Sequence, residues 1–213
     1  MNERYSGLVD NFDEYTYHFL GCGAIGSAAA TTMVRMGANM VHLYDMDRVE
    51  SPNIGVSIYD TNDIDKPKVE ALKDKLIAIN PNAYISTHNG EFQNILQEPR
   101  NVIILGFDSM QSRLDAVKNI LDLEKPEILI DGRMGAEYYQ QYTFEQPTLK
   151  EYMKTWYTDD TADDVPCNQK ATSYCSNMTG SLICNNVKKI LKDEPYIKNF
   201  SFNFVTCSLD LHK

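Results

Sequence analysis

Short apolar runs alternate with longer segments of helical spacing through the first part of the chain. Tyr15 to Leu20 is the first apolar run and leads into a glycine-rich turn, after which Ser27 to Met36 reads as a helix that stops at Gly37. Asn39 to Tyr44 is the next apolar run. Strand, glycine turn, helix and strand in this order predict a mononucleotide-binding βαβ unit.

The same alternation continues for about three more strands. A helix is expected to begin at Asp65-Lys66-Pro67, because a polar cap followed by proline is typical of a first helical turn. The remaining expected elements are strands at 84–87, 102–107 and 128–130 and a helix at 109–123. The run at 102–107 is almost entirely apolar, as in strands buried on both faces of a parallel sheet. We therefore predict an α/β fold with a Rossmann-like, doubly wound, mostly parallel sheet.

The pattern changes in the C-terminal third. Glu137 to Phe144 is extended and rich in tyrosine with no crossover helix before it, so we expect the sheet to become mixed there. Residues 145–168 contain prolines and an acidic cluster, which indicates a long loop or lid with helical pieces. Thr172 to Leu191 predicts a long helix, and Asn199 to Leu209 a final strand. We expect a single domain over residues 1–213.

Composition narrows the choice of ligands. The chain is 43% hydrophobic and 23% charged, which is ordinary globular usage. A formal net charge of −10 argues against DNA as a partner, and it means that an anionic ligand must be received by local dipoles, a few cations and a divalent metal. No apolar stretch approaches the roughly 18 residues of a membrane span. The polar amino terminus is not a secretory signal, so we expect a cytoplasmic protein with no membrane partner.

The glycine-rich turn reads Gly21-Cys22-Gly23-Ala24-Ile25-Gly26. Without β-carbons, phosphate oxygens can approach the backbone, and the following helix offers unpaired N–H groups at its amino end. Asp45 and Asp47 end the second strand about 20 residues later, where a carboxylate accepts hydrogen bonds from ribose hydroxyls. This combination predicts a nucleotide site, and tight helix–strand packing without a ligand is the alternative. No GxxxxGK[ST] motif is present, which argues against a P-loop NTPase.

Four separated stretches between Phe19 and Arg113 resemble the ThiF/MoeB superfamily of ubiquitin-activating-enzyme-like adenylyltransferases. They read GCGAIGS, LYDMDRVESPN, DIDKPKVEALKDKLIAINPNA and GFDSMQSR. The resemblance implies a ThiF-like nucleotide-binding domain that uses ATP and Mg²⁺ to adenylate a carboxylate. It also implies a homodimer whose partner is a ubiquitin-like or sulfur-carrier protein, or a peptide C-terminus.

The resemblance assigns roles to particular residues. Asp45 matches the acid that binds the ribose, and Asn53 matches an asparagine that contacts the nucleotide. Lys68 matches the lysine that stabilises the ATP phosphates, and Asp108 matches the aspartate that binds magnesium. These roles suit attack by a carboxylate on the α-phosphorus, because a metal and a cation would stabilise the crowded negative charge. Outside the motif, Lys68 would read as a solvated helix-face lysine and Asp108 as a helix cap.

Two cations of the family pattern are absent. Val56 and Gly7 stand where relatives have arginines. Arg133 follows a predicted central strand and is a candidate replacement by position, with simple pairing to an acid as the alternative. A ThiF-like nucleotide-binding or adaptor protein without turnover remains an alternative function, as does adenylation of a nucleoside carboxyl group in RNA or of a short peptide. An NAD-linked oxidoreductase is a third, but it leaves Lys68 and Asp108 without a role.

Cys167 precedes the last predicted helix in the stretch PCNQKAT. This resembles the catalytic-cysteine stretch of activating enzymes that pass the adenylated glycine to a thioester. A helix amino end and the nearby Lys170 would lower the pKa of a thiol there, and an inert buried cysteine is the alternative. The chain has no CxxC pair, so we expect no zinc site. The other cysteines read as packing or strand residues: Cys22, Cys175, Cys184 and Cys207.

Overall fold

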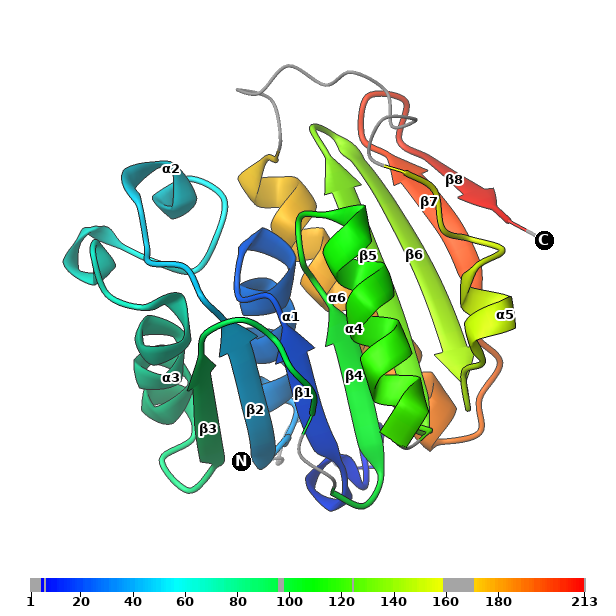
Figure 1. Cartoon of the computed structure of the whole chain (residues 1–213), viewed down its shortest axis with the longest axis horizontal. Helices are drawn as coiled ribbons and strands as arrows, with labels where there is room; N and C mark the ends of the chain where they lie inside the picture. Colours follow the sequence, from blue (N-terminus) through cyan, green and yellow to red (C-terminus); the bar gives the residue numbers. More distant parts are fainter. Residues whose placement is uncertain (1–4, 6, 96–97, 124, 159–170, 213) are drawn as a thin grey trace.

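The computed structural model describes residues 5, 7–95, 98–123, 125–158 and 171–212. Over these residues the strands form one sheet in the order β3-β2-β1-β4-β5-β6-β7-β8, with helices on both faces (Figure 1). Strands β1 to β5 pair in parallel, and β6, β7 and β8 join antiparallel. The prediction of a doubly wound sheet that becomes mixed toward the C-terminus is confirmed.

The elements have the following bounds. The strands are β1 Thr16–Leu20, β2 Met40–Asp45, β3 Tyr84–Asn89, β4 Asn101–Leu105, β5 Ile128–Gly135, β6 Tyr138–Glu145, β7 Asn199–Asn203 and β8 Ser208–Leu211. The helices are α1 Ala24–Arg35, α2 Ser51–Ile54, α3 Lys68–Ile79, α4 Met110–Leu123, α5 Leu149–Tyr152 and α6 Ser173–Leu191, with 3-10 turns η1 Phe12–Glu14 and η2 Thr61–Asp63.

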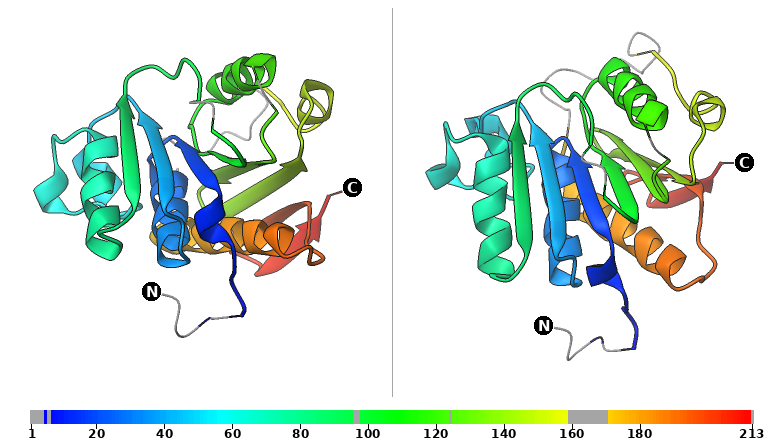
Figure 2. Two further views of the ribbon diagram at one scale, coloured as in Figure 1. Left: turned by 90° about the horizontal axis from the view of Figure 1, so that it is seen from below. Right: turned by 60° about the horizontal axis from the view of Figure 1, so that its bottom comes forward.

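Strand β1 is buried along its whole length because helices pack on both faces of the sheet beside it. Tyr17 and Phe19 join the core under α1, α3 and α6, whereas Leu20 joins the core under α4 and α5. Figure 2 shows these two helix layers on opposite sides of the twisted sheet. Since β1 lies between β2 and β4, the strand order reverses at its carboxyl end, which is where ligands bind in open α/β sheets.

Helices α1 and α6 meet closely because the contact is made by small residues. A β-carbon placed on Gly180 would lie 2.7 Å from the backbone of Ala28, so glycine is required at this crossing. Cys175 and Cys184 on α6 are buried, as the sequence predicted. No helix among the described residues is long and apolar enough to cross a membrane.

The expectation of a single final strand over Asn199 to Leu209 is wrong. The chain forms the hairpin β7–β8, with an exposed turn between them that holds Cys207. The side-chain oxygen of Asn203 accepts hydrogen bonds from the main-chain N–H groups of Val205 (2.9 Å) and Thr206 (3.4 Å), which is how asparagine initiates a turn. The alternating phenylalanines end at Phe204, the first residue of this turn, so their period alone did not reveal where the strand stops.

Candidate nucleotide site

The glycine loop between β1 and α1 contains two glycines at which a β-carbon would clash with the backbone and a third at which there is open space. Gly21 has φ +95°, and a β-carbon there would lie 2.7 Å from the backbone of Gly106. A β-carbon on Gly26 would lie 1.9 Å from the carbonyl oxygen of Gly21. At Gly23 no heavy atom lies within 4 Å of a β-carbon position. The open side of the loop is therefore at Gly23, where a ligand oxygen has room to reach the backbone.

The amino end of α1 faces this open position. Gly23 is the N-cap residue of α1 and has no side chain to cap the helix, and the first turn contains no acidic residue. The first N–H groups of a helix have no partner within it, and they carry the positive end of the helix dipole. The loop can accordingly receive an anionic group without help from the net charge of the chain.

Asp45, the last residue of β2, connects this strand to the glycine loop by a hydrogen bond. One carboxylate oxygen accepts the main-chain N–H of Cys22 at 2.7 Å, and the other accepts the N–H of Asp47 at 2.9 Å. Burial raises the pKa of Asp45, and the nearby Lys68 together with these two N–H groups acts in the opposite direction. Asp45, the residue predicted to bind the ribose, is thus held in a fixed position beside the loop.

Lys68 is the predicted cation of the site. It begins α3, and its ammonium lies 2.8 Å from the Asp47 carboxylate. Burial tends to lower the pKa of Lys68, but the charges of Asp45, Asp47 and Asp108 outweigh it and the pKa is raised. Asp108 is exposed in the turn after β4. The structure therefore brings the glycine loop, Asp45 and Asp47, Lys68 and Asp108 together at the carboxyl ends of β1, β2 and β4.

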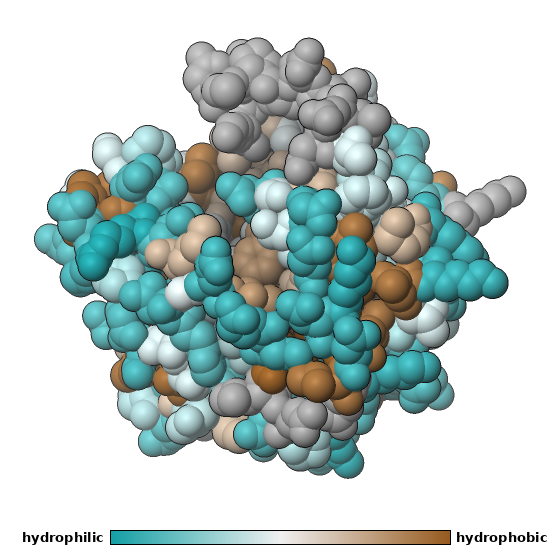
Figure 3. Space-filling model, viewed as in Figure 1, coloured by the Kyte–Doolittle hydropathy of each residue, from teal (hydrophilic) through white to brown (hydrophobic). Residues whose placement is uncertain are grey.

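The surroundings of the site are polar and hollowed. In the space-filling view of Figure 3, most of this face is hydrophilic, and it is hollowed between the residues of α2 and those of α4. Tyr59 lies buried nearby and donates its hydroxyl to the carbonyl of Cys22 at 2.6 Å, while the carbonyl of Lys68 lies 3.2 Å from the same hydroxyl. The glycine loop and the start of α3 are therefore joined by one side chain.

Asn53 has a local partner in the structure. It lies in the short helix α2, where its side-chain oxygen accepts the main-chain N–H of Glu50 at 2.9 Å as part of a capping box. Its contact with a nucleotide stays a prediction. Val56, at which the resemblance implies an arginine, lies half-buried just after this helix.

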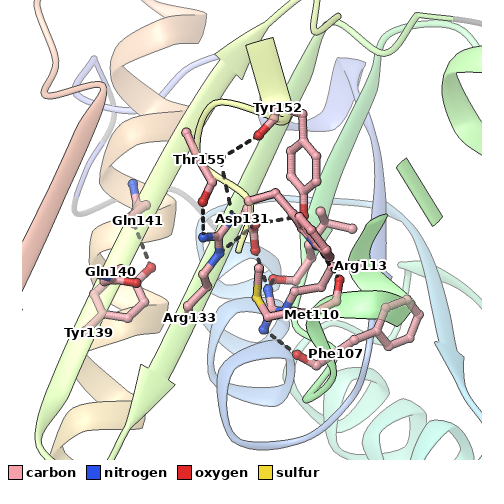
Figure 4. A network of polar contacts seen from close by, with 12 residues as sticks. Phe107, Met110, Arg113, Asp131, Arg133, Tyr139, Gln140, Gln141, Tyr152 and Thr155 are labelled. Carbon is pink, nitrogen blue, oxygen red and sulfur yellow. Dashed lines mark hydrogen bonds and ion pairs between the residues drawn. The ribbon is translucent and has the colours of Figure 1, made fainter. Parts of the chain in front are cut away.

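Arg133 lies within β5, paired with Gln140 of β6, whereas the sequence placed it beyond the end of a shorter strand. The run was underestimated because Asp131 and Gly132 interrupt the apolar pattern. Arg133 is 5% exposed and donates to Asp131 and to Thr155, as Figure 4 shows. A contact between Arg133 and a phosphate stays a prediction. It would require the guanidinium to give up a hydrogen bond to Asp131 or to Thr155.

Asp131 and Arg113 complete a buried network that residue-by-residue reasoning missed. Asp131 is fully buried and pairs with both Arg113 and Arg133 (Figure 4). A signal for it was present, because Arg113 falls three residues from Met110 and one from Leu114, on the apolar face of its helix. A charged residue on such a face requires a buried partner.

Two sequence expectations concern residues without a structural description. Cys167 and Lys170 lie outside the described residues, as does the part of the expected lid at 145–168 that follows position 158. Among the residues that are described, no group of three or more His, Cys, Asp or Glu side chains could hold a metal ion. The assignment of magnesium to Asp108 therefore stays a prediction.

Comparison with known families decides the relationship of this chain. A model of the ThiF family matches residues 9–212. The chain belongs to the ThiF family. Ubiquitin-like modifier-activating enzyme 5 from Caenorhabditis elegans is 36% identical over 86 residues, and that from Xenopus laevis is 31% identical over 86 residues. The matches cover 39% of this chain and only 20% and 22% of those proteins, so the ThiF-family chain spans a small part of their length.

Solved structures of ThiF-like fold match almost the whole chain. MccB from E. coli superimposes with a TM-score of 0.77 at 16% identity, and it covers 97% of this chain while the chain covers 64% of MccB. PaaA gives a TM-score of 0.71 at 19% identity, with coverage of 95% and 64%. At these identities the likeness establishes the fold, which agrees with the sheet order of this ThiF-family member.

Proposed function

We propose that this ThiF-family chain binds ATP across the carboxyl ends of β1, β2 and β4 and adenylates a carboxylate. The observation that carries the proposal is the open position at Gly23, on the loop that Asp45 binds and near Lys68 and Asp108. The helix amino end suits phosphate, and Asp45 suits ribose. Lys68 and Asp108 have a role in adenylation and none in an NAD-linked reaction.

In the proposed reaction, a carboxylate oxygen attacks the α-phosphorus of ATP, and the bond to pyrophosphate breaks. Lys68 stabilises the negative charge that accumulates on the phosphates. Because Lys68 pairs with Asp47 at 2.8 Å, it exchanges this partner for a phosphate oxygen when ATP binds. One exposed carboxylate at Asp108 fits magnesium, since this ion commonly takes one or two protein carboxylates together with substrate phosphates. Bound there, Mg²⁺ would neutralise phosphate charge.

The proposed acceptor is the C-terminal carboxylate of a ubiquitin-like protein, a sulfur carrier or a peptide. Two kinds of relative support it: the matching eukaryotic proteins are named ubiquitin-like modifier-activating enzymes, and MccB has been crystallised with ATP and with MccA. We also propose that the protein acts as a homodimer in the cytoplasm. Transfer of the adenylated carboxylate to Cys167 as a thioester is a further proposed step.

Calorimetric titration tests nucleotide binding first. ATP with magnesium is compared with ATP alone and with NAD, for the wild type and for Asp108→Ala. We expect magnesium-dependent ATP binding that Asp108→Ala weakens about tenfold, because the metal loses a ligand. Asp122→Ala, at an exposed acid of α4, is the matched control and should bind as the wild type does. Binding of NAD alone would reject the proposal.

A ThiF-like scaffold without turnover is a second candidate, favoured by Val56 and Gly7. Pyrophosphate exchange into ATP in the presence of candidate carrier proteins separates it from an active enzyme. ATP binding without exchange for any carrier would favour the scaffold. The thioester step would be supported if Cys167→Ala keeps pyrophosphate exchange but no longer forms a thiol-sensitive conjugate with the carrier. Cys207→Ala is the control, because Cys207 is exposed in the β7–β8 turn.

A further inference from the structure

Arg113 lies on α4, but its guanidinium reaches back to the turn that precedes this helix. Nη1 donates to the carbonyl oxygen of Leu105 at 3.3 Å, and Nη2 donates to that of Phe107 (Figure 4). These carbonyls lie on either side of Gly106 and just before Asp108. A planar guanidinium that holds both of them fixes the path of the backbone toward Asp108.

The same turn is packed against the glycine loop. The N–H of Gly106 donates to the carbonyl of Leu20 at 2.7 Å, and a β-carbon on Gly106 would lie 3.3 Å from both the oxygen of Gly21 and the nitrogen of Gly26. The turn is thus supported by the loop on one side and by Arg113 on the other. Any shift of the turn would change the position of Asp108 relative to the open side of the loop.

The charge of Arg113 is met by a carboxylate with no access to water. Asp131 is 0% exposed, accepts Nη2 of Arg133 at 2.6 Å, and accepts the hydroxyl of Tyr152 at 3.1 Å. Burial would raise the pKa of Asp131, but the two guanidinium groups outweigh it and the pKa is lowered. One carboxylate therefore faces two guanidinium groups, and the network carries one excess positive charge behind the Asp108 turn.

Arg133 extends the network to the segment that follows α5. Its Nη1 donates to the carbonyl of Thr155 at 2.6 Å, and its guanidinium lies 4.5 Å from the ring centroid of Tyr142. Trp156 then donates from its indole nitrogen to the carbonyl of Met110, the first residue of α4, at 2.8 Å. The network consequently joins α4, β5 and the 152–156 segment around one turn.

We propose that Arg113 is a positioning residue for Asp108, and that Asp131 and Arg133 hold Arg113 in place. This rests on the proposed function, because it concerns the part that Asp108 plays in magnesium-dependent ATP binding. Arg113 acts through the turn and not by touching the ligand, since it is 4% exposed and its donors go to Leu105, Phe107 and Asp131. A network that only stabilised the fold would have no particular connection with Asp108.

A double-mutant cycle separates these two roles. ATP binding with magnesium is measured by calorimetry on the full chain for the wild type, Arg113→Lys, Asp108→Ala and the double variant. Lysine keeps the charge but lacks the planar fork whose two nitrogens donate to the carbonyls of Leu105 and Phe107. We expect Arg113→Lys to weaken binding about fivefold in the wild-type background and to have no further effect in Asp108→Ala. Equal losses in both backgrounds would overturn the proposal.

Hydrogen exchange of residues 105–110 tests the positioning without ATP. We expect faster exchange in Arg113→Lys, whereas Arg100→Lys, the same change at an exposed arginine paired with Glu14, should leave it unchanged. Should the wild type fail to bind ATP while this difference is present, the proposed function fails and the positioning stands. Unchanged exchange would overturn the positioning whatever ATP does.

A milder variant covers the case in which Arg113→Lys does not fold. Tyr152→Phe removes only the hydroxyl bound to Asp131 and keeps the ring in the core. Exchange at residues 105–110 should rise in this variant as well, by less than in Arg113→Lys. The absence of any rise would count against the network as the support of the Asp108 turn.

Discussion

The carboxylate of Asp45 accepts the main-chain N–H of Cys22 across a distance of 2.7 Å, so the acid at the end of β2 holds the glycine loop in place. Cys22 is fully buried, and its N–H would lose its acceptor in Asp45→Ala. We expect that variant to lose about 1–3 kcal/mol of stability in urea unfolding, with Asp45→Asn losing less because an amide oxygen can still accept. Asp74→Ala, at an exposed helical acid, is the control and should change little. An unchanged midpoint for Asp45→Ala would show that water replaces the carboxylate.

Gly23 and Gly26 should respond differently to the same change. Gly26→Ala places a β-carbon 1.9 Å from a backbone oxygen, and we expect a loss of about 3 kcal/mol or more. Gly23→Ala meets no atom within 4 Å and should cost at most about 1 kcal/mol, through the helix cap. Its ATP affinity should nevertheless fall at least about tenfold, because the methyl group occupies the place of a phosphate oxygen. Thermal unfolding and calorimetry measure the two effects, and wild-type affinity in a folded Gly23→Ala would place the phosphates elsewhere.

Three histidines on adjacent strands should make the protein sensitive to mild acid. The rings of His18 and His42 stack at 4.9 Å, and those of His42 and His88 at 5.5 Å. Burial lowers the pKa of His18 to about 3 and that of His42 to about 4. Since the unfolded chain binds these protons below about pH 6.5, stability is lost as the pH falls from there toward the folded values.

The size of this effect can be measured between pH 7 and pH 5, where carboxylates of ordinary pKa remain mostly ionised. His18 alone should account for about 2 kcal/mol of lost stability over that interval, because it is fully buried. In His18→Gln the difference in the free energy of unfolding between pH 7 and pH 5 should shrink by that amount, whatever the variant's stability at pH 7. His212→Gln, at an exposed residue near the C-terminus, should keep the wild-type difference. A wild type equally stable at both pH values would mean that protonated histidine is accommodated in the fold.

Arg133→Ala should destabilise the protein by about 3 kcal/mol, because it empties the space of a buried side chain and removes its hydrogen bonds to Asp131 and Thr155. Chemical unfolding measures this loss, and a decrease below about 1 kcal/mol would show that Arg113 alone suffices. The same variant tests the predicted phosphate contact. ATP affinity that is unchanged in the folded fraction would remove Arg133 from the nucleotide site.

The sequence predicted the sheet and the glycine loop well because both depend on local patterns. Apolar runs mark the buried strands, and Gly21 to Gly26 marks the turn between β1 and α1. The β7–β8 hairpin was missed because Phe204 continues the alternation of β7 into the turn that the side chain of Asn203 initiates. The partners of Arg133 were missed for another reason. Asp131 is two residues away, but Thr155 comes from a separate segment whose docking no local pattern encodes.

The contact between Gly21 and Gly106 also bears on the order of assembly. These residues are far apart in sequence, yet the carbonyl of Gly106 would lie 2.7 Å from a β-carbon on Gly21. Because β1 is flanked by β2 and by β4, the loop gains its contact with Gly106 only after β4 has been synthesised and has paired with β1. During synthesis the first βαβ unit therefore emerges with an incomplete loop, and competence to hold a nucleotide should arise late, together with the centre of the sheet.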